Sequence, residues 1–229
     1  MATEGKEVEF VAGGRSAHGY LALPAGPGPV PAVIVIQEWW GLTDHIKDIA
    51  GRFAAKGYAA LAPDLYYGRV TKDAGEAGQL MQGLDQKKAL ATLDAAVDYL
   101  SAQPGVDATR IGVTGFCMGG TYALLMAANN RHIKAAAPFY GDVPAADVLE
   151  RLAAPVLFFG AEQDQWITME KIGRLQEGLK KYGKTGEVKV YKGVGHAFFN
   201  DTRPEAYDKA AAEDAWSRVT QFFAVHLRK

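Results

Sequence analysis

The stretch Ile111-Gly-Val-Thr-Gly-Phe-Cys-Met-Gly-Gly-Thr-Tyr-Ala-Leu-Leu-Met-Ala-Ala128 shows how the chain is built. It begins with a short β-branched run typical of a buried strand and ends in an apolar run typical of a helix. Between them lies a glycine-rich turn with Cys117 at its centre and Gly115 and Gly119 two residues away on either side. This G-x-C-x-G spacing predicts a nucleophile elbow, a turn so tight that it pushes the Cys117 side chain upward and leaves room only for glycine beside it.

The alternation of strand and helix extends over the rest of the chain and predicts an α/β fold. We expect a mostly parallel sheet of about eight strands with helices on both faces, in a single domain over residues 1–229. The expected strands are Lys6–Val11, His18–Leu23, Ala32–Ile36, Tyr58–Ala62, Arg110–Thr114, Ile133–Phe139, Pro155–Phe159 and Val188–Tyr191. The expected helices are Thr43–Lys56, Gln79–Gln103, Met118–Asn129, Met169–Tyr182 and a last one opened by the capping box Thr202-Arg-Pro-Glu205.

Composition excludes several classes of function. The 229 residues include 25 Lys and Arg against 26 Asp and Glu, a net charge of -1, so no basic excess exists for nucleic acid or a membrane surface. The N-terminus lacks the pattern of a signal peptide, and no apolar run is long enough to span a bilayer. One cysteine excludes an intramolecular disulfide and a Cys-rich zinc site, and no His and carboxylate spacing predicts a metal. A monomeric cytoplasmic protein is the default expectation.

Cys117 is the candidate nucleophile. At a helix N-terminus the backbone N–H groups and the helix dipole favour a thiolate over a thiol. The N–H of Met118, the next residue, would point to where an oxyanion forms. The alternative is a buried and inert cysteine in a glycine-rich turn.

A cysteine nucleophile needs a base, and the base needs an acidic partner that orients it. Of five histidines, His196 is the candidate base because it follows the last expected strand in the loop Gly193-Val-Gly195-His196. Asp164, after the strand before it, is the favoured acid, with Asp142 and Glu162 as the alternatives. The chain order of nucleophile, acid and base is the expected one for this type of fold. The other histidines suit structural or solvated roles: His18, His45, His132 and His226.

The loop Gln37-Glu-Trp-Trp-Gly41 follows the strand Ala32–Ile36. In this type of fold the loop after that strand supplies a second N–H to the oxyanion hole. A carboxylate at Glu38 would lie near Cys117, where it could pair with the thiol proton or hold the thiol aside. The alternative is a partly buried Glu38 bonded to the backbone of its own loop.

At these residues the sequence resembles the dienelactone hydrolase family of α/β-hydrolases over nearly its whole length. The matching motifs are Gln37-Glu-x-x-Gly41, Ala62-Pro-Asp-Leu-Tyr66, Gly115-Phe-Cys-Met-Gly-Gly120, Gly160-x-x-x-Asp164 and Gly195-His196. The resemblance implies hydrolysis of small esters or lactones without a cofactor, by a triad of Cys117, His196 and Asp164. It also implies that Glu38 partners the resting thiol and that the N–H groups of Trp39 and Met118 form the oxyanion hole.

The substrate-binding residues differ in part from the family. Where the family has an arginine four residues after its histidine, this chain has Asn200. The family's other arginine lies in the segment before the long helix, where the early cations of this chain are Arg69 and Lys72. Aromatic residues near the expected cleft predict an apolar or aromatic substrate group, although core packing accounts for about half of them. The candidate substrate-binding residues are Trp40, Tyr66, Arg69, Tyr140, Trp166, Phe198 and Asn200.

Two other functions remain open from the sequence. A thioesterase or another small-acyl hydrolase would use the same triad and differ only in its pocket. A catalytically silent scaffold that binds a small ligand would have no need of the three residues together.

Overall fold

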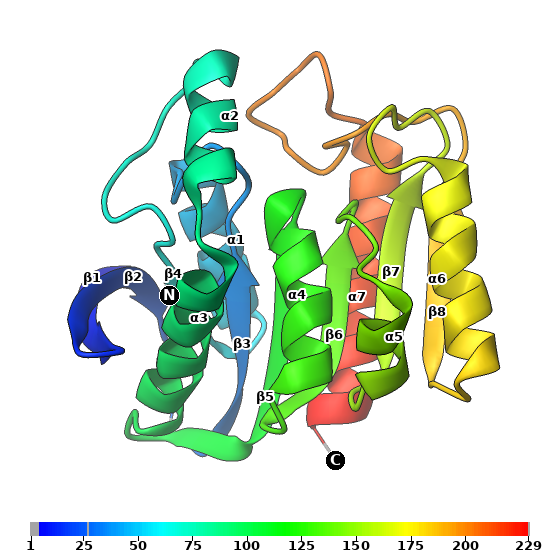
Figure 1. Ribbon diagram of the computed structural model, residues 1–229. Coiled ribbons are helices and arrows are strands. Elements are labelled where there is room, and N and C mark those ends of the chain that lie inside the picture. Colours follow the sequence, from blue (N-terminus) through cyan, green and yellow to red (C-terminus); the bar gives the residue numbers. More distant parts are fainter. Residues whose placement is uncertain (1–4, 27, 229) are drawn as a thin grey trace. The chain divides into compact units, whose positions relative to one another are not determined.

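The computed structural model describes residues 5–26 and 28–228, which fall into two compact units, residues 1–111 and 112–229 (Figure 1). Strand β5 (Val106–Phe116) begins in the first unit and ends in the second. The strand order is β1-β2-β4-β3-β5 in the first unit and β5-β6-β7-β8 in the second. The prediction of an α/β fold with a mostly parallel sheet of about eight strands is confirmed.

The first unit begins with a hairpin of β1 (Gly5–Ala12) and β2 (Arg15–Ala22), in which Gly5 lies opposite Ala22. Gly13 and Gly14 form its turn and have φ angles of 57° and 79°, a conformation that glycine adopts without steric cost. The other strands are β3 (Val30–Ile36) and β4 (Ala59–Pro63). β4 pairs antiparallel with β2 and parallel with β3.

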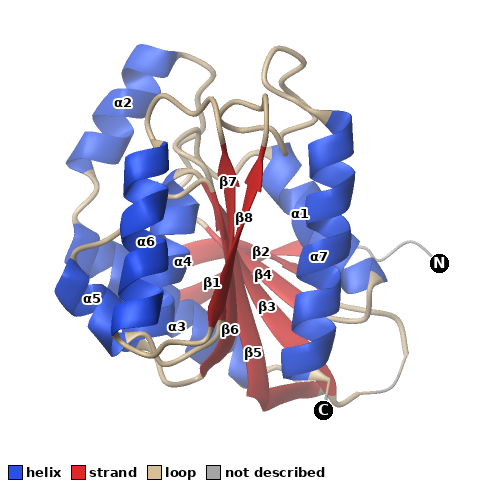
Figure 2. Ribbon diagram, turned by 90° about the vertical axis from the view of Figure 1, so that its right-hand side faces the viewer, coloured by secondary structure: helices blue, strands red, loops and turns tan. Residues whose placement is uncertain are grey.

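Three helices belong to the first unit: α1 (Asp44–Ala55), α2 (Ala74–Gly83) and α3 (Gln86–Ser101). α1 and α3 pack on its strands from opposite faces (Figure 2). Every residue of β3 after Val30 is buried, as its uninterrupted apolar sequence predicts for a strand covered on both faces.

The expected helix over Gln79–Gln103 is wrong, because the segment forms α2 and α3 with a break at Leu84. Asp85 has an extended backbone and its side chain accepts a hydrogen bond of 2.9 Å from the N–H of Lys88. An aspartate that caps a new helix competes with continuation of the old one, and Gly83 weakens the end of α2.

The second unit continues β5 with three strands, β6 (Ile133–Phe139), β7 (Val156–Ala161) and β8 (Gly186–Tyr191). β6, β7 and β8 are mutually parallel, so their carboxyl ends meet at one edge of the sheet. The helices α4 (Met118–Asn129), α5 (Ala146–Arg151) and α6 (Met169–Lys181) lie on one face of these strands, and α7 (Lys209–Leu227) lies on the other (Figure 2). The short helix α5 lies in a segment for which the sequence predicted no element.

The predicted start of the last helix is also wrong. α7 begins at Lys209, and its cap is Asp208, whose side chain accepts a hydrogen bond of 2.8 Å from the N–H of Ala211. Thr202 instead donates its hydroxyl to Asn200, and Glu205 pairs with Arg203 at 2.7 Å. Both side chains of the predicted capping box therefore have other partners.

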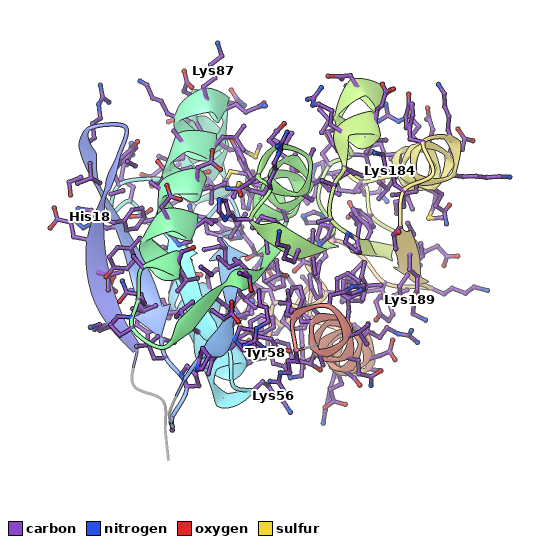
Figure 3. The ribbon with its side chains drawn as sticks, turned by 90° about the horizontal axis from the view of Figure 1, so that it is seen from below. His18, Lys56, Tyr58, Lys87, Lys184 and Lys189 are labelled. Carbon is purple, nitrogen blue, oxygen red and sulfur yellow. The ribbon has the colours of Figure 1, made fainter. Side chains whose placement is uncertain are left out.

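An aromatic cluster fills the core of the second unit. The ring of Phe139 lies 4.3 Å from Phe159, 4.7 Å from Phe116 and 5.0 Å from Phe199, measured between centroids. Lys87, near the start of α3, is exposed and extends away from the ribbon (Figure 3). Within the described residues, none of the helices combines the length and the apolar character needed to cross a membrane.

Candidate active site

Cys117 occupies the turn between β5 and α4 with φ 55° and ψ -118°. This backbone conformation is costly for any residue with a side chain and persists only where the surroundings impose it. One such constraint is the hydrogen bond of 3.1 Å from the N–H of Cys117 to the carbonyl of Phe139. The side chain is half-buried. The backbone thus forms the sharp strand-to-helix turn that the G-x-C-x-G spacing predicts.

Beside this turn, the backbone segments that contain Gly120 and Gly141 approach each other closely. A Cβ atom on Gly120 would lie 2.5 Å from the carbonyl oxygen of Phe139, and one on Gly141 would lie 2.3 Å from the carbonyl carbon of Gly120. Glycine is therefore required at both positions. Sequence reasoning assigned the crowded positions to Gly115 and Gly119, which stays a prediction, and missed this pair. The double glycine at 119–120 is the feature of the sequence that could have indicated this close approach.

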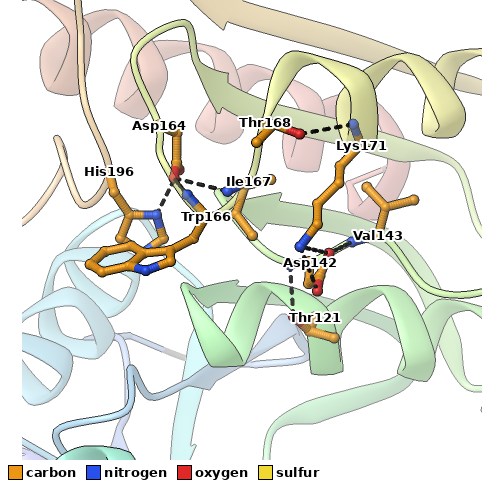
Figure 4. A network of polar contacts seen from close by, with 9 residues as sticks. All are labelled: Thr121, Asp142, Val143, Asp164, Trp166, Ile167, Thr168, Lys171 and His196. Atoms are coloured by element: carbon orange, nitrogen blue, oxygen red, sulfur yellow. Dashed lines mark hydrogen bonds and ion pairs between the residues drawn. The ribbon is translucent and has the colours of Figure 1, made fainter.

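His196 and Asp164 come together from the loops after β8 and β7. His196 Nδ1 lies 2.6 Å from Asp164 Oδ2, while Asp164 Oδ1 accepts hydrogen bonds from the N–H groups of Trp166 and Ile167 at 2.8 and 2.9 Å (Figure 4). Burial opposes ionisation of Asp164, but the hydrogen bond and charge of His196 outweigh it, and the pKa of the carboxyl is lowered. An ionised Asp164 fixes the orientation of the imidazole through Nδ1, which leaves Nε2 able to exchange a proton.

The environment of His196 favours its protonated form. Burial lowers the pKa of the imidazole, but the hydrogen bond to Asp164 and the neighbouring Cys117 side chain raise it more, to about 10. Nε2 is buried and makes no hydrogen bond of regular geometry within the described part of the chain. The joint role of Cys117, His196 and Asp164 as a catalytic triad stays a prediction.

The two alternative acids have other partners. The Asp142 carboxylate forms an ion pair with Lys171 at 3.0 Å, and its backbone N–H donates to Thr121 (Figure 4). Glu162 accepts a hydrogen bond of 2.9 Å from the N–H of Gly193 and so supports the loop that carries His196. Of the three carboxylates, Asp164 is the one that contacts His196, and its role as the acid stays a prediction. Sequence reasoning missed Lys171, which only the fold brings beside Asp142.

Aromatic side chains surround the imidazole of His196. Tyr140 lies 5.0 Å from it and Trp166 lies 4.8 Å from it, between ring centroids. Tyr140 is fully buried, whereas Trp166 is 60% exposed. Phe198, a predicted substrate-binding residue, is instead fully buried against Tyr140 and Tyr191. The loop thus turns the ring of Phe198 into the core, and its role in substrate binding stays a prediction.

Three further predicted substrate-binding residues have structural contacts of their own. Asn200 is buried, and its side-chain oxygen accepts hydrogen bonds from the backbone and hydroxyl of Thr202. Arg69 is exposed and pairs with Glu76 at 2.8 Å. Tyr66 is buried, with its N–H donated to Asp64. Substrate contact by these side chains stays a prediction.

The loop after β3 belongs to the first unit. Glu38 is buried to 1% exposure, directly after Gln37, whose side-chain oxygen accepts a hydrogen bond of 3.1 Å from the N–H of Leu65. Trp39 and Trp40 are half-buried and pack edge to face at 4.9 Å. The roles predicted for Glu38, Trp39 and Trp40 stay predictions.

Among the residues that the structure describes, no group of three or more His, Cys, Asp or Glu side chains could hold a metal ion.

Comparison with known proteins adds a family to this geometry. The profile of the dienelactone hydrolase family matches residues 17–227. Protein usf of Aquifex pyrophilus is 38% identical over 97% of this chain and 99% of its own. A Bradyrhizobium protein named "Probable 2-oxo-3-(5-oxofuran-2-ylidene)propanoate lactonase" is 35% identical over 99% of this chain and 98% of its own.

A crystal structure from Klebsiella pneumoniae, titled "Putative Dienelactone Hydrolase", superposes with a TM-score of 0.92 and 32% identity over 98% of this chain and 99% of that one. The family profile, the named relatives and this structure agree with each other and with the α/β-hydrolase fold. The chain is a hydrolase that belongs to the dienelactone hydrolase family.

Proposed function

We propose that the protein hydrolyses small carboxylic esters or lactones through Cys117, His196 and Asp164. The observation that carries the proposal is the 2.6 Å hydrogen bond between Asp164 Oδ2 and His196 Nδ1, together with the sharp strand-to-helix turn that holds Cys117. A nucleophile, a base and an orienting carboxylate linked in this way are the requirements of acyl transfer. The lactonase name of the Bradyrhizobium relative supports the same class of substrate.

In the proposed reaction the Cys117 thiolate attacks the carbonyl carbon and forms a tetrahedral intermediate. The N–H groups of Met118 and Trp39 are the proposed donors to its oxyanion. Collapse breaks the carbon–oxygen bond, and the leaving alkoxide takes the proton from His196 Nε2. His196 then removes a proton from water, whose oxygen attacks the thioester and releases the carboxylic acid. Throughout, Asp164 holds Nδ1–H and stabilises the imidazolium.

Substitution of the nucleophile tests the proposal. We expect Cys117→Ala to abolish turnover of p-nitrophenyl acetate, and the wild-type protein to show a burst of one p-nitrophenol per chain if deacylation is slow. Retained turnover in Cys117→Ala would exclude the proposed nucleophile. Absence of both turnover and acylation across a panel of esters and lactones would favour a silent scaffold, and preference for thioesters would favour a thioesterase.

The two aspartates give a matched pair of variants. Asp164→Asn should lower kcat about a thousandfold or more, because the imidazole then loses the partner that sets its tautomer. Asp142→Asn should leave kcat within about twofold, because Asp142 pairs with Lys171 instead of His196. Equal losses in the two variants would contradict the assignment of the acid.

A further inference from the structure

The imidazole of His196 has aromatic neighbours on two sides that differ in exposure. Tyr140 is fully buried and contacts it from the interior, at a ring-centroid distance of 5.0 Å and an interplanar angle of 58°. Trp166 contacts it at 4.8 Å and 88°, an edge-to-face arrangement, and is 60% exposed. The indole, itself exposed, lies beside the imidazole (Figure 4).

The backbone of Trp166 is bound by the same carboxylate that contacts His196. Asp164 Oδ1 accepts the backbone N–H of Trp166 at 2.8 Å, while Oδ2 binds His196 Nδ1 at 2.6 Å. One buried carboxylate thus binds both the imidazole and the backbone of the residue whose indole contacts that imidazole. The side chain of Asp164 is 0% exposed and that of His196 is 11% exposed, although Trp166 beside them faces water.

A single hydrogen bond at Nδ1 does not by itself fix the tilt of the imidazole ring. An edge-to-face aromatic contact limits such tipping, because the interaction weakens as the rings leave this geometry. Exclusion of water also strengthens the hydrogen bond, since its electrostatic energy rises in a medium of lower dielectric constant.

We propose that Trp166 is a positioning residue for His196, whose indole keeps the imidazole in its orientation and shields its hydrogen bond to Asp164 from water. The assignment rests on the proposed function, in which His196 is the base. It differs from the role in substrate binding that the sequence predicts for Trp166, because the contact is with the base itself.

The test combines Trp166→Ala, Trp166→Leu and Trp166→Phe with Met169→Ala as the control. Met169 is a second exposed apolar side chain, 46% exposed at the start of α6. We expect Trp166→Ala and Trp166→Leu to lower kcat for p-nitrophenyl acetate about tenfold with KM within about twofold, because a displaced base slows chemistry more than binding. Trp166→Phe should recover most of the loss, and Met169→Ala should leave kcat unchanged.

A second measurement needs no substrate. The low-field proton resonance of His196 Nδ1–H in the free protein should exchange with water faster in Trp166→Ala and Trp166→Leu, and at the wild-type rate in Met169→Ala. An unchanged exchange rate, or a rise in KM with kcat unchanged, would overturn the proposal. If Cys117→Ala remained active, the proposed nucleophile would be wrong. The exchange measurement would still test the role of Trp166, because it needs no turnover. Trp166→Leu keeps the test decisive if Trp166→Ala does not fold.

Discussion

At the scale of single residues, Asp164 is bound through both oxygens of its carboxylate. Its two carboxylate oxygens accept three hydrogen bonds, two from backbone N–H groups and one from His196. Each bond favours the ionised carboxylate, and together with the charge of His196 they outweigh the cost of burial. This arrangement links the orientation of the base to the stability of the loop after β7.

The lowered pKa of Asp164 predicts a loss of stability in acid. In the folded state the pKa lies below the ordinary value of 3.8, so the unfolded chain binds the proton more readily. The contribution is therefore present above pH 4 and is lost as the pH falls through the folded pKa, by at most about 1.4 kcal/mol per pH unit. Urea unfolding of wild type and Asp164→Asn at pH 7, 5, 4 and 3 should give free energies of unfolding that converge in acid. Parallel curves would contradict the prediction.

Glu38 is the second residue whose role can be tested alone. If its carboxylate opposes formation of the Cys117 thiolate, iodoacetamide should alkylate the wild-type protein slowly and Glu38→Gln several-fold faster. The chain has one cysteine, so the incorporated label reports on Cys117 only. Glu162→Gln is the control, because that carboxylate binds the N–H of Gly193. Equal rates in wild type and Glu38→Gln would remove the role.

At the scale of elements, side-chain caps mark where four of the described helices begin. Asp73, Asp85, Thr168 and Asp208 each accept a backbone N–H in the first turn of a helix. The break between α2 and α3 and the late start of α7 both follow from such a cap. Local competition between side chains for backbone donors therefore outweighs the periodicity of the apolar residues at these points.

The start of α7 predicts opposite results for two neighbouring acids. Asp208→Ala should lower the free energy of unfolding by about 1 kcal/mol, because the N–H of Ala211 loses its partner. Glu205→Gln should leave the unfolding midpoint unchanged, since Glu205 caps no helix. Thermal unfolding of both variants measures this, and a larger loss for Glu205→Gln would place the cap at the predicted capping box after all.

The close backbone approach at Gly141 gives another stability prediction, with Gly173 in α6 as the comparison. Gly141→Ala should cost about 3 kcal/mol or more, because its Cβ would lie 2.3 Å from backbone atoms of Gly120 and Thr121 that cannot move independently. Gly173→Ala, inside α6 and facing open space, should raise stability by about 0.5 to 1 kcal/mol. Denaturant titration compares the two, and a Gly141→Ala protein as stable as wild type would refute the close approach.

At the scale of the whole molecule, β5 links the two compact units. The boundary between them, at residues 111 and 112, falls inside this strand and not in a loop. Unfolding of one unit alone would therefore break β5 in its middle, in a strand that both units share. We therefore expect a single cooperative unfolding transition with equal calorimetric and van't Hoff enthalpies. Two resolved transitions would contradict the single domain that the sequence predicts.

The sequence by itself determined the class of the fold and the chemistry of the candidate residues. Alternating strand and helix patterns depend on local periodicity, and the glycine spacing around Cys117 and the loop position of His196 are also local features. The choice of Asp164 over Asp142 was only a preference, because both follow strands that end at the same edge of the sheet.

Only the tertiary structure decided which distant side chains meet. It pairs Asp164 with His196, gives Asp142 to Lys171, and turns Phe198 into the core while Trp166 covers the imidazole. The close approach of Gly120 and Gly141 also joins segments twenty-one residues apart. These contacts depend on how loops from different strands pack against one another, and the periodicity of a single segment carries no information about that packing.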